Sequence, residues 1–351
     1  MTDTSTSNTN PEVKLIPDLF KPEASKATRD GFGKGLLELG EKNENVWGLS
    51  ADVSESSRTH WFADKFPKRF VQVGVAEQNM AGVAAGIAGA DPDKIVFVSA
   101  FGAFSPGRNW DQIRVSVCYN DVNVKFHASH TGLTVGPDGA SHQILEDIAL
   151  MRSLPNMIVI VPADAEETRK ATHALAQIHG PGYIRTGREK SAVFTTKDTP
   201  FVIGKANIYR SFAPDGNASD NKSSGDVAIF ACGFVVYESL KAAEQLAKKG
   251  INAAVIDCHT IKPIDKKTIL EYAKACGLIV AVEEHQIDGG MGSAIAEVLA
   301  ENAADFPCRL VRHGIHNRFC ESGDAPDLLK KYELDGNGIA KVVEAAVKKH
   351  P

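Results

Sequence analysis

Hydrophobic positions recur along this chain with two different periods. Phe32, Leu36 and Leu39 are spaced as on one face of a helix that Gly40 ends, whereas Ile95–Val98 is a continuous apolar run typical of a buried strand. The alternation continues toward the C-terminal end, so the pattern predicts an α/β protein with two doubly wound parallel sheets and right-handed crossovers. The expected strands cover residues 46–49, 70–73, 94–98, 122–127, 157–161, 227–230, 253–257, 278–283 and 309–311. Further helices are expected over residues 76–90, 109–118, 164–178, 236–249, 265–276 and 291–302.

Two polar segments suggest how the chain is divided. Residues 1–22 offer almost nothing to bury and are expected to form a disordered tail. Residues 211–225 are turn-forming and polar, which predicts an exposed loop. Its N-x-S sequons, at Asn217 and Asn221, have little weight without a secretory signal. We therefore expect a first domain over residues 23–195 and a second over residues 196–351, which fits roughly 150 residues per domain.

Charge and cysteine content exclude several classes of function. The chain has 39 Lys and Arg against 44 Asp and Glu, a net charge of −5, which argues against a nucleic-acid or anionic-membrane partner. No apolar stretch approaches the ~18 residues of a membrane span, and the first dozen residues do not resemble a signal peptide. Six cysteines without a C-x-x-C pair disfavour a zinc site or a disulfide scaffold. We expect a cytoplasmic protein that contributes no metal ligands.

Four segments could bear chemistry, and residue type alone leaves each of them open. Gly290-Met291-Gly292 is a poor dinucleotide fingerprint, because the third glycine is missing and the preceding strand is not adjacent; a glycine-rich turn that opens a helix is the better interpretation. Phe101 and Phe104 at a strand end could stack on a flat ring or belong to the core. Residues 129–143, with three glycines and two histidines, could form a functional or a structural loop. Glu77 at a helix start could be held by the helix dipole or could bind a ligand nitrogen in a dry pocket.

Considered together, these segments resemble the transketolase family. Val75-Ala76-Glu77-Gln78-Asn79-Met80, Phe101-x-x-Phe104, His130 through Gln143 and Arg152-Ser153-Leu154-Pro155-Asn156 are similar to its pyrimidine-binding domain in order and spacing. Ala27-Thr28-Arg29 and Ser50-Ala51-Asp52-x-x-x-Ser56 also fit. Ile261-Lys262-Pro263-Ile264-Asp265 and the segment from Glu283 to Ala294 resemble its C-terminal domain.

The resemblance implies thiamine diphosphate as cofactor and a role for each matching residue. Glu77 would hydrogen-bond N1′ of the aminopyrimidine, so that the cofactor acts as its own base. His130 and His142 would act in catalysis by contacting the donor sugar, and His130 would also lie near the cofactor. The other cofactor-binding residues implied are Asp52, Val75, Phe101 and Phe104. The implied substrate-binding residues are Arg29, Ser56, Asp138, His142 and Arg185, with Arg188 as the alternative to Arg185.

The resemblance also implies a partner chain. Members of the family hold the diphosphate and Mg²⁺ (or Ca²⁺) through a Gly-Asp-Gly motif, which this sequence lacks. We therefore expect the C-terminal subunit of a split transketolase, active only with an N-terminal diphosphate-binding subunit, in an α2β2 heterotetramer that acts on sugar phosphates.

Three other functions stay open at this point. Gln78 is shared with 1-deoxyxylulose-5-phosphate synthases, the nearest rival, although these usually have an arginine where His130 stands. Gly107 replaces a tyrosine that the family often has near the cofactor. The remaining alternatives are a ketol transferase for an unusual sugar and a non-catalytic scaffold.

Overall fold

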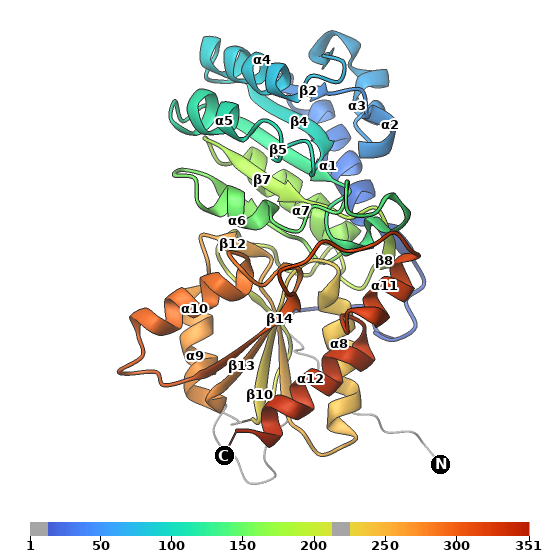
Figure 1. The fold of residues 1–351 in the computed structure, drawn as a ribbon. Coiled ribbons are helices and arrows are strands. Elements are labelled where there is room, and N and C mark those ends of the chain that lie inside the picture. The colour runs from blue at the N-terminus through green and yellow to red at the C-terminus, as the bar shows by residue number, and fades with distance from the viewer. Residues whose placement is uncertain (1–12, 213–224, 351) are drawn as a thin grey trace.

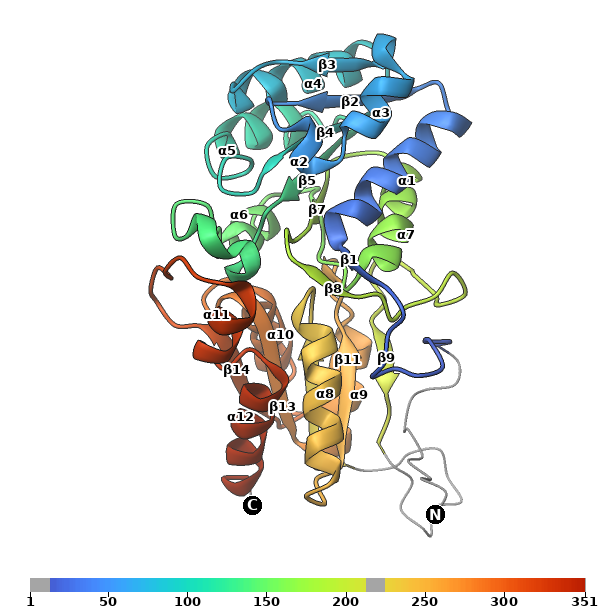
Figure 2. The same ribbon diagram turned by 90° about the vertical axis from the view of Figure 1, so that its right-hand side faces the viewer.

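The computed structural model describes residues 13–212 and 225–350, which form two α/β layers joined end to end (Figures 1 and 2). The first sheet has seven strands in the order β12-β6-β7-β5-β4-β2-β3, and the second has five in the order β14-β13-β10-β11-β9. A two-stranded antiparallel ribbon, β1 with β8, lies between the layers. The expected α/β fold is confirmed.

The elements expected in the first half are found close to their expected ranges, whereas β1, β7, β8, α2, α3 and α6 were not expected. Helices α1 and α7 pack together on one face of the seven-stranded sheet, and α4 to α6 lie on the other (Figure 2). The strands are β1 Ser25–Ala27, β2 Val46–Ser50, β3 Phe70–Gln72, β4 Ile95–Phe101, β5 Val124–Ser129, β6 Ile158–Ile160, β7 Gly182–Arg185 and β8 Lys190–Ala192. The helices are α1 Thr28–Lys42, α2 Ser54–Ser57, α3 His60–Lys65, η1 Pro67–Arg69, α4 Glu77–Ala90, α5 Trp110–Gln112, η2 Ile113–Cys118, η3 Leu133–Asp138, α6 Asp147–Arg152 and α7 Ala165–Ala176. The expected helix over residues 109–118 is a short α-helical turn that continues as the π-helix η2.

The second half repeats the alternation around the smaller sheet. Helices α8 and α12 pack together on one face, and α9 and α10 on the other (Figure 1). The strands are β9 Asn207–Arg210, β10 Val227–Ala231, β11 Ala253–Asp257, β12 Thr260–Lys262, β13 Leu278–Gln286 and β14 Arg309–Ile315. The helices are α8 Val235–Ala247, α9 Lys266–Cys276, α10 Met291–Glu301, α11 Ala325–Lys331 and α12 Gly336–Lys348.

The expectation of purely parallel sheets is wrong at two edges. Strand β9 runs antiparallel to β11, and β12 runs antiparallel to β6. Only residues 258 and 259 separate β12 from β11, yet β12 pairs with β6 of the first sheet whereas β11 belongs to the second.

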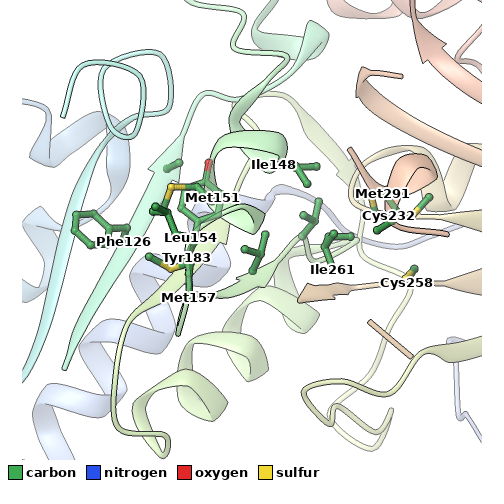
Figure 3. Packing of buried hydrophobic residues seen from close by; sticks show 14 of the residues in the cluster. Phe126, Ile148, Met151, Leu154, Met157, Tyr183, Cys232, Cys258, Ile261 and Met291 are labelled. Carbon is green, nitrogen blue, oxygen red and sulfur yellow. The ribbon is translucent and has the colours of Figure 1, made fainter. Parts of the chain in front are cut away.

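The two layers share one buried core. Phe126, Met151 and Tyr183 of the first layer belong to the same apolar cluster as Cys232 and Met291 of the second (Figure 3). Burial of apolar surface is the main free-energy term that holds the layers together. It contributes roughly 25 cal/mol for each Å² of apolar surface removed from water. The domain boundary near residue 195 stays a prediction, because β12 belongs to the second half in sequence and to the first sheet in space.

Residues 13–22 lie against the second layer. Within this part of the expected tail, Val13 and Leu19 are buried in the core around α8, and the Tyr237 hydroxyl donates to the Leu19 carbonyl oxygen. Residues 1–12, and Asn217 and Asn221 in the expected loop, lie outside the described residues. No helix in the described ranges is long and apolar enough to cross a membrane.

Candidate active site

The carboxyl ends of neighbouring parallel strands bring the predicted site residues to one edge of the first sheet. Asp52 follows β2, Glu77 follows β3, Phe101 ends β4 and His130 follows β5. Because these strands are adjacent, in the order β3-β2-β4-β5, residues far apart in the sequence become neighbours. In open α/β sheets this edge is where ligands bind. The N-terminal end of α1 adds Arg29, through its contacts with Ser56 and His130.

Glu77 is the first residue of α4 and is only 2 % exposed. Its Oε2 accepts a hydrogen bond from Arg108 Nη1 at 3.1 Å, and the positive end of the helix dipole favours its negative charge. The Asn109 amide donates to the Glu77 carbonyl oxygen at 3.0 Å and to Ser105 Oγ at 3.2 Å. The segment after Phe104 is thereby fixed against the start of α4.

Aromatic rings cluster beside this carboxylate. Phe101 and Phe104 have centroids 6.2 Å apart and an interplanar angle of 25°, and His130 stacks on Phe101 at 3.9 Å. The edge of His142 meets Phe104 at 5.3 Å. Such an arrangement offers flat apolar faces next to a buried hydrogen-bonding group, which is what a planar heterocycle requires.

The hydrogen bonds of His130 define its tautomer. Arg29 Nη1 lies 3.0 Å from His130 Nε2, and a guanidinium can only donate, so Nε2 accepts. Nδ1 must then bear the proton that is shared with Ser129 Oγ at 2.7 Å. Burial, with the positive charge of Arg29 second, lowers the pKa of His130 to about 3. The imidazole is therefore neutral at physiological pH.

Three arginines give this end of the site an excess of positive charge. Burial and the nearby Arg58 lower the pKa of Arg29, and Arg188 adds to the repulsion. Asp30 neutralises Arg58 through an ion pair of 2.7 Å, but no ion pair is found for Arg29 or Arg188 among the described residues. Arg29 Nε is buried and has no hydrogen-bond partner. A buried, unpaired guanidinium N–H is an unsatisfied donor that an anionic ligand would satisfy.

The structure does not bring Arg185 into this group. Its side chain is 5 % exposed, and its Nε donates to Asp147 Oδ2 at 2.8 Å while Nη2 donates to the Glu284 carbonyl oxygen at 3.0 Å. Burial would lower the pKa of Arg185, but Asp147 and Glu284 raise it above its ordinary value. Arg185 therefore joins the two layers, and Arg188, the alternative, lies near Arg29 and His130.

The other predicted residues lie at the edge or surface of the group. Asp52 is exposed with a positive φ of 61°, and its backbone N–H donates to Gln72 Oε1. Val75 is 70 % exposed, and Asp138 is exposed on η3. Ser56 is half-buried and its carbonyl oxygen accepts from Arg29.

Two residues of the site were not predicted. Arg108 contacts both Glu77 and the ring of Phe104, and Glu284 accepts a hydrogen bond from the Thr134 N–H inside the loop of residues 131–143. Arg108 lies only four residues after Phe104 in the sequence, and this short separation could have been used to predict that it belongs to the site. Glu284 is 150 positions from Thr134, and no local pattern reveals such a pair.

Glycine positions explain two features of the sequence. A Cβ at Gly107 would overlap the carbonyl oxygen of Ala103, so the tyrosine that the family often has here cannot fit this backbone. At Gly290 a Cβ would overlap the Glu283 carboxylate, which accepts from the N–H groups of Met291 and Gly292. The chain's own carboxylate fills the start of α10, so this turn offers no pyrophosphate site and the expected glycine-rich turn is confirmed.

Comparisons with known proteins agree with this geometry. The transketolase pyrimidine binding domain matches residues 24–192, and the transketolase C-terminal domain matches residues 216–339. A putative transketolase C-terminal section of Methanocaldococcus jannaschii is 45 % identical over 326 residues, covering 92 % of this chain and 97 % of the relative. One subunit of an apulose-4-phosphate transketolase from Phocaeicola vulgatus is 36 % identical, covering 92 % and 98 %. A solved structure described as a split gene transketolase, an inactive β4 tetramer, has a TM-score of 0.80 at 42 % identity, covering 92 % and 98 %.

The fold and the site thus define a pyrimidine-binding domain followed by a transketolase-type C-terminal domain. The chain belongs to the transketolase family.

The residues present fit the pyrimidine half of thiamine diphosphate. Glu77 provides a buried carboxylate oxygen, and Phe101 and Phe104 provide the ring faces beside it. In the described part of the chain, no group of three or more His, Cys, Asp or Glu side chains could hold a metal ion.

Proposed function

We propose that the chain is the pyrimidine-binding subunit of a split transketolase, which transfers a two-carbon ketol unit reversibly from a ketose phosphate to an aldose phosphate. The observation that supports this most strongly is Glu77, buried at the edge of the sheet beside Phe101 and Phe104 in a transketolase pyrimidine-binding domain. Two relatives matched over nearly their whole length are named as a C-terminal section and as one subunit of a transketolase, which supports the division into subunits.

In this proposal the chain's residues hold and orient the cofactor. Thiamine diphosphate, when bound, supplies the carbon nucleophile and stores the electron pair of the transferred unit. Glu77 shares a hydrogen bond with N1′ of its pyrimidine, and Phe101 and Phe104 pack on the ring. Asp52 and Val75 lie at the cofactor's margin, and the partner subunit holds the diphosphate with Mg²⁺ or Ca²⁺.

The substrate lies between the arginines and the histidines. Arg29, Ser56 and Arg188 bind the phosphate; Arg188 replaces Arg185, whose Nε and Nη2 already donate to groups inside the protein. His142 and Asp138 contact the sugar hydroxyl groups. His130, neutral because of its burial and Arg29, can hydrogen-bond a hydroxyl or carbonyl without repelling the arginines.

An exposed face formed by α4 and η2, which pack together, is proposed to receive the partner. Val75 is 70 % exposed and Tyr119 is 85 % exposed, while a Cβ at Gly82 or Gly86 of α4 would meet nothing within 4 Å. Small residues on a helix allow close approach of another backbone, so this face suits a helix of the N-terminal subunit in an α2β2 assembly.

A second candidate is ketol transfer with an unusual sugar. The relative from Phocaeicola vulgatus is named for apulose 4-phosphate, and its subunit is 36 % identical to this chain. Both candidates use the same cofactor site and differ only in the donor and acceptor.

Reconstituted activity tests the proposal. The chain is assayed for ketol transfer with thiamine diphosphate and Mg²⁺, alone and co-expressed with the diphosphate-binding subunit, across a panel of sugar phosphates. Activity in the mixture, with a preference within the panel, supports the proposal and identifies the substrate. A stable complex that transfers no ketol unit would point to a scaffold instead.

A further inference from the structure

One side chain covers both groups assigned to the pyrimidine ring. Arg108 Nη1 donates to Glu77 Oε2 at 3.1 Å, and the Arg108 guanidinium carbon lies 4.7 Å from the centroid of Phe104. The Arg108 side chain is 51 % exposed, whereas Glu77 is 2 % exposed. The half-exposed guanidinium therefore lies between the buried Glu77 carboxylate and solvent.

The backbone around Arg108 is held by hydrogen bonds, whereas its side chain is half-exposed. The N–H of Arg108 donates to the Phe104 carbonyl oxygen, and the next residue, Asn109, is tied to Glu77 and Ser105. Gly107, where no Cβ fits, precedes Arg108, whose guanidinium carbon lies 4.7 Å from the centroid of Phe104. No other ion pair or side-chain hydrogen bond is found for the Arg108 guanidinium among the described residues.

The contacts of Arg108 compete with those proposed for the cofactor. A ring that packs on Phe104 and hydrogen-bonds Glu77 would use the same aromatic ring and the same carboxylate as Arg108. While Arg108 donates to Glu77 Oε2, that oxygen is occupied by the ion pair. In the proposed site the ring and the guanidinium therefore compete for these two groups.

From this overlap we propose that the Arg108 side chain pairs with Glu77 in the cofactor-free chain and is displaced when the cofactor binds. We call this ion pair the latch. In the cofactor-free chain it pairs with a carboxylate that would otherwise be buried without a cation, which is costly. When the pyrimidine enters, Arg108 swings into solvent, where its half-exposed guanidinium regains water. Arg108 is thus a positioning residue that lowers the affinity of the chain for the cofactor. This inference rests on the proposed function.

Cofactor affinity tests the latch directly. The dissociation constant of thiamine diphosphate is measured by fluorescence quenching in the complex with the N-terminal subunit, for the native chain, Arg108→Met and Arg108→Lys. We expect Arg108→Met to bind about tenfold more tightly, because the competitor for Glu77 is gone. Arg108→Lys should lie between the two, since it keeps the charge but loses the planar stack. Arg318→Met, an exposed arginine in the second domain, controls for net charge.

The same comparison in a Glu77→Gln background isolates the ion pair. Without the carboxylate Arg108 has no anion to pair with. In this background Arg108→Met should therefore change the affinity for thiamine diphosphate less than about twofold. Weaker binding by Arg108→Met, or equal tightening in both backgrounds, would overturn the latch while leaving the cofactor site in place. A native complex that binds no thiamine diphosphate would overturn the proposed function, and the latch with it.

Discussion

Two arginines at the end of β7 show how far neighbouring residues can differ in role. Arg185, the last residue of the strand, is turned into the protein and paired with Asp147, whereas Arg188, three positions later, lies near Arg29 and His130. In the sequence Arg185 was the expected phosphate-binding residue and Arg188 its alternative. The hydrogen bonds distinguish them, because Arg185 Nε and Nη2 already donate to Asp147 and to the Glu284 carbonyl oxygen.

Replacing each arginine by methionine separates these roles. Arg188→Met should raise the KM for sugar phosphates about tenfold or more and leave the melting temperature nearly unchanged. Arg185→Met should instead destabilise the fold by roughly 3–5 kcal/mol, because it leaves Asp147 buried without its cation. Steady-state kinetics and thermal unfolding of the two variants measure this contrast. A raised KM for Arg185→Met without loss of stability would favour Arg185 as the phosphate-binding residue.

Glu77 is the residue on which the proposed chemistry depends most. Glu77→Gln should lower ketol transfer by the complex at least about 100-fold, because the amide cannot share a proton with N1′ as a carboxyl group does. The melting temperature should change little, since the amide fits the same space. Glu166→Gln on α7, which removes a half-buried ion pair with Arg169, is the matched control. Retained activity in Glu77→Gln would mean that another group serves the pyrimidine.

The elements were largely predictable, whereas the contacts that complete the site were not. Local patterns predicted α4, β4 and the loop after β5, because apolar periodicity and glycine spacing are properties of short segments. The start of α7 also depends on a local pattern, because Asp164 precedes the helix and its side chain accepts from the Glu167 N–H. Single-sequence patterns do not encode how distant segments meet. They therefore missed the contact of Arg108 with the Phe104 ring, the hydrogen bond from the Thr134 N–H to Glu284, and the position of β12.

The exposed face of α4 gives a prediction for the element as a whole. Gly82→Leu should fold normally, because nothing lies within 4 Å of the added Cβ, and should weaken association with the N-terminal subunit about tenfold or more. Ala300→Leu, on an exposed position of α10, should not affect association. Size-exclusion chromatography with light scattering measures both variants. Undiminished assembly of Gly82→Leu would place the partner on another face.

At the scale of the whole molecule, buried charged groups join the two halves. Asp164 and Glu167 of α7 lie with Asp257 of β11 and Tyr209 of β9, all fully buried, and His259 follows β11 nearby. Asp164 accepts four hydrogen bonds, and Glu167 accepts from Ala163 N–H and from the Tyr209 hydroxyl. Neither Asp257 oxygen has a hydrogen-bond partner of good geometry. Burial, with Glu167 second, therefore raises the pKa of Asp257 well above its ordinary value.

This raised pKa predicts an inverted pH dependence for one carboxyl group. The folded chain holds the Asp257 proton more tightly than the unfolded chain, whose pKa is near ~3.9. The stabilisation is fully present below that pH and is lost as the pH rises toward the folded pKa. Asp257→Asn should therefore stabilise the chain at pH 7, and the gain should shrink as the pH falls toward about 4. Each kcal/mol gained in the free energy of unfolding should raise the melting temperature by about 2–4 °C.

Asp164→Asn is the matched control for that measurement. Its amide cannot accept the four hydrogen bonds that the carboxylate accepts, so this variant should be less stable than the native chain at pH 7. A loss of stability in Asp257→Asn at neutral pH would show that Asp257 is ionised in the folded chain.

The central claim is that this chain provides half of a cofactor site. Calorimetric titration of thiamine diphosphate with Mg²⁺ into the chain, the N-terminal subunit and their equimolar mixture tests it most directly. We expect one cofactor bound per pair of subunits in the mixture, no comparable binding by the chain alone, and loss of most of the affinity with Phe104→Ala. Equal binding by the chain alone, or binding by the mixture that Phe104→Ala leaves unchanged, would contradict the claim.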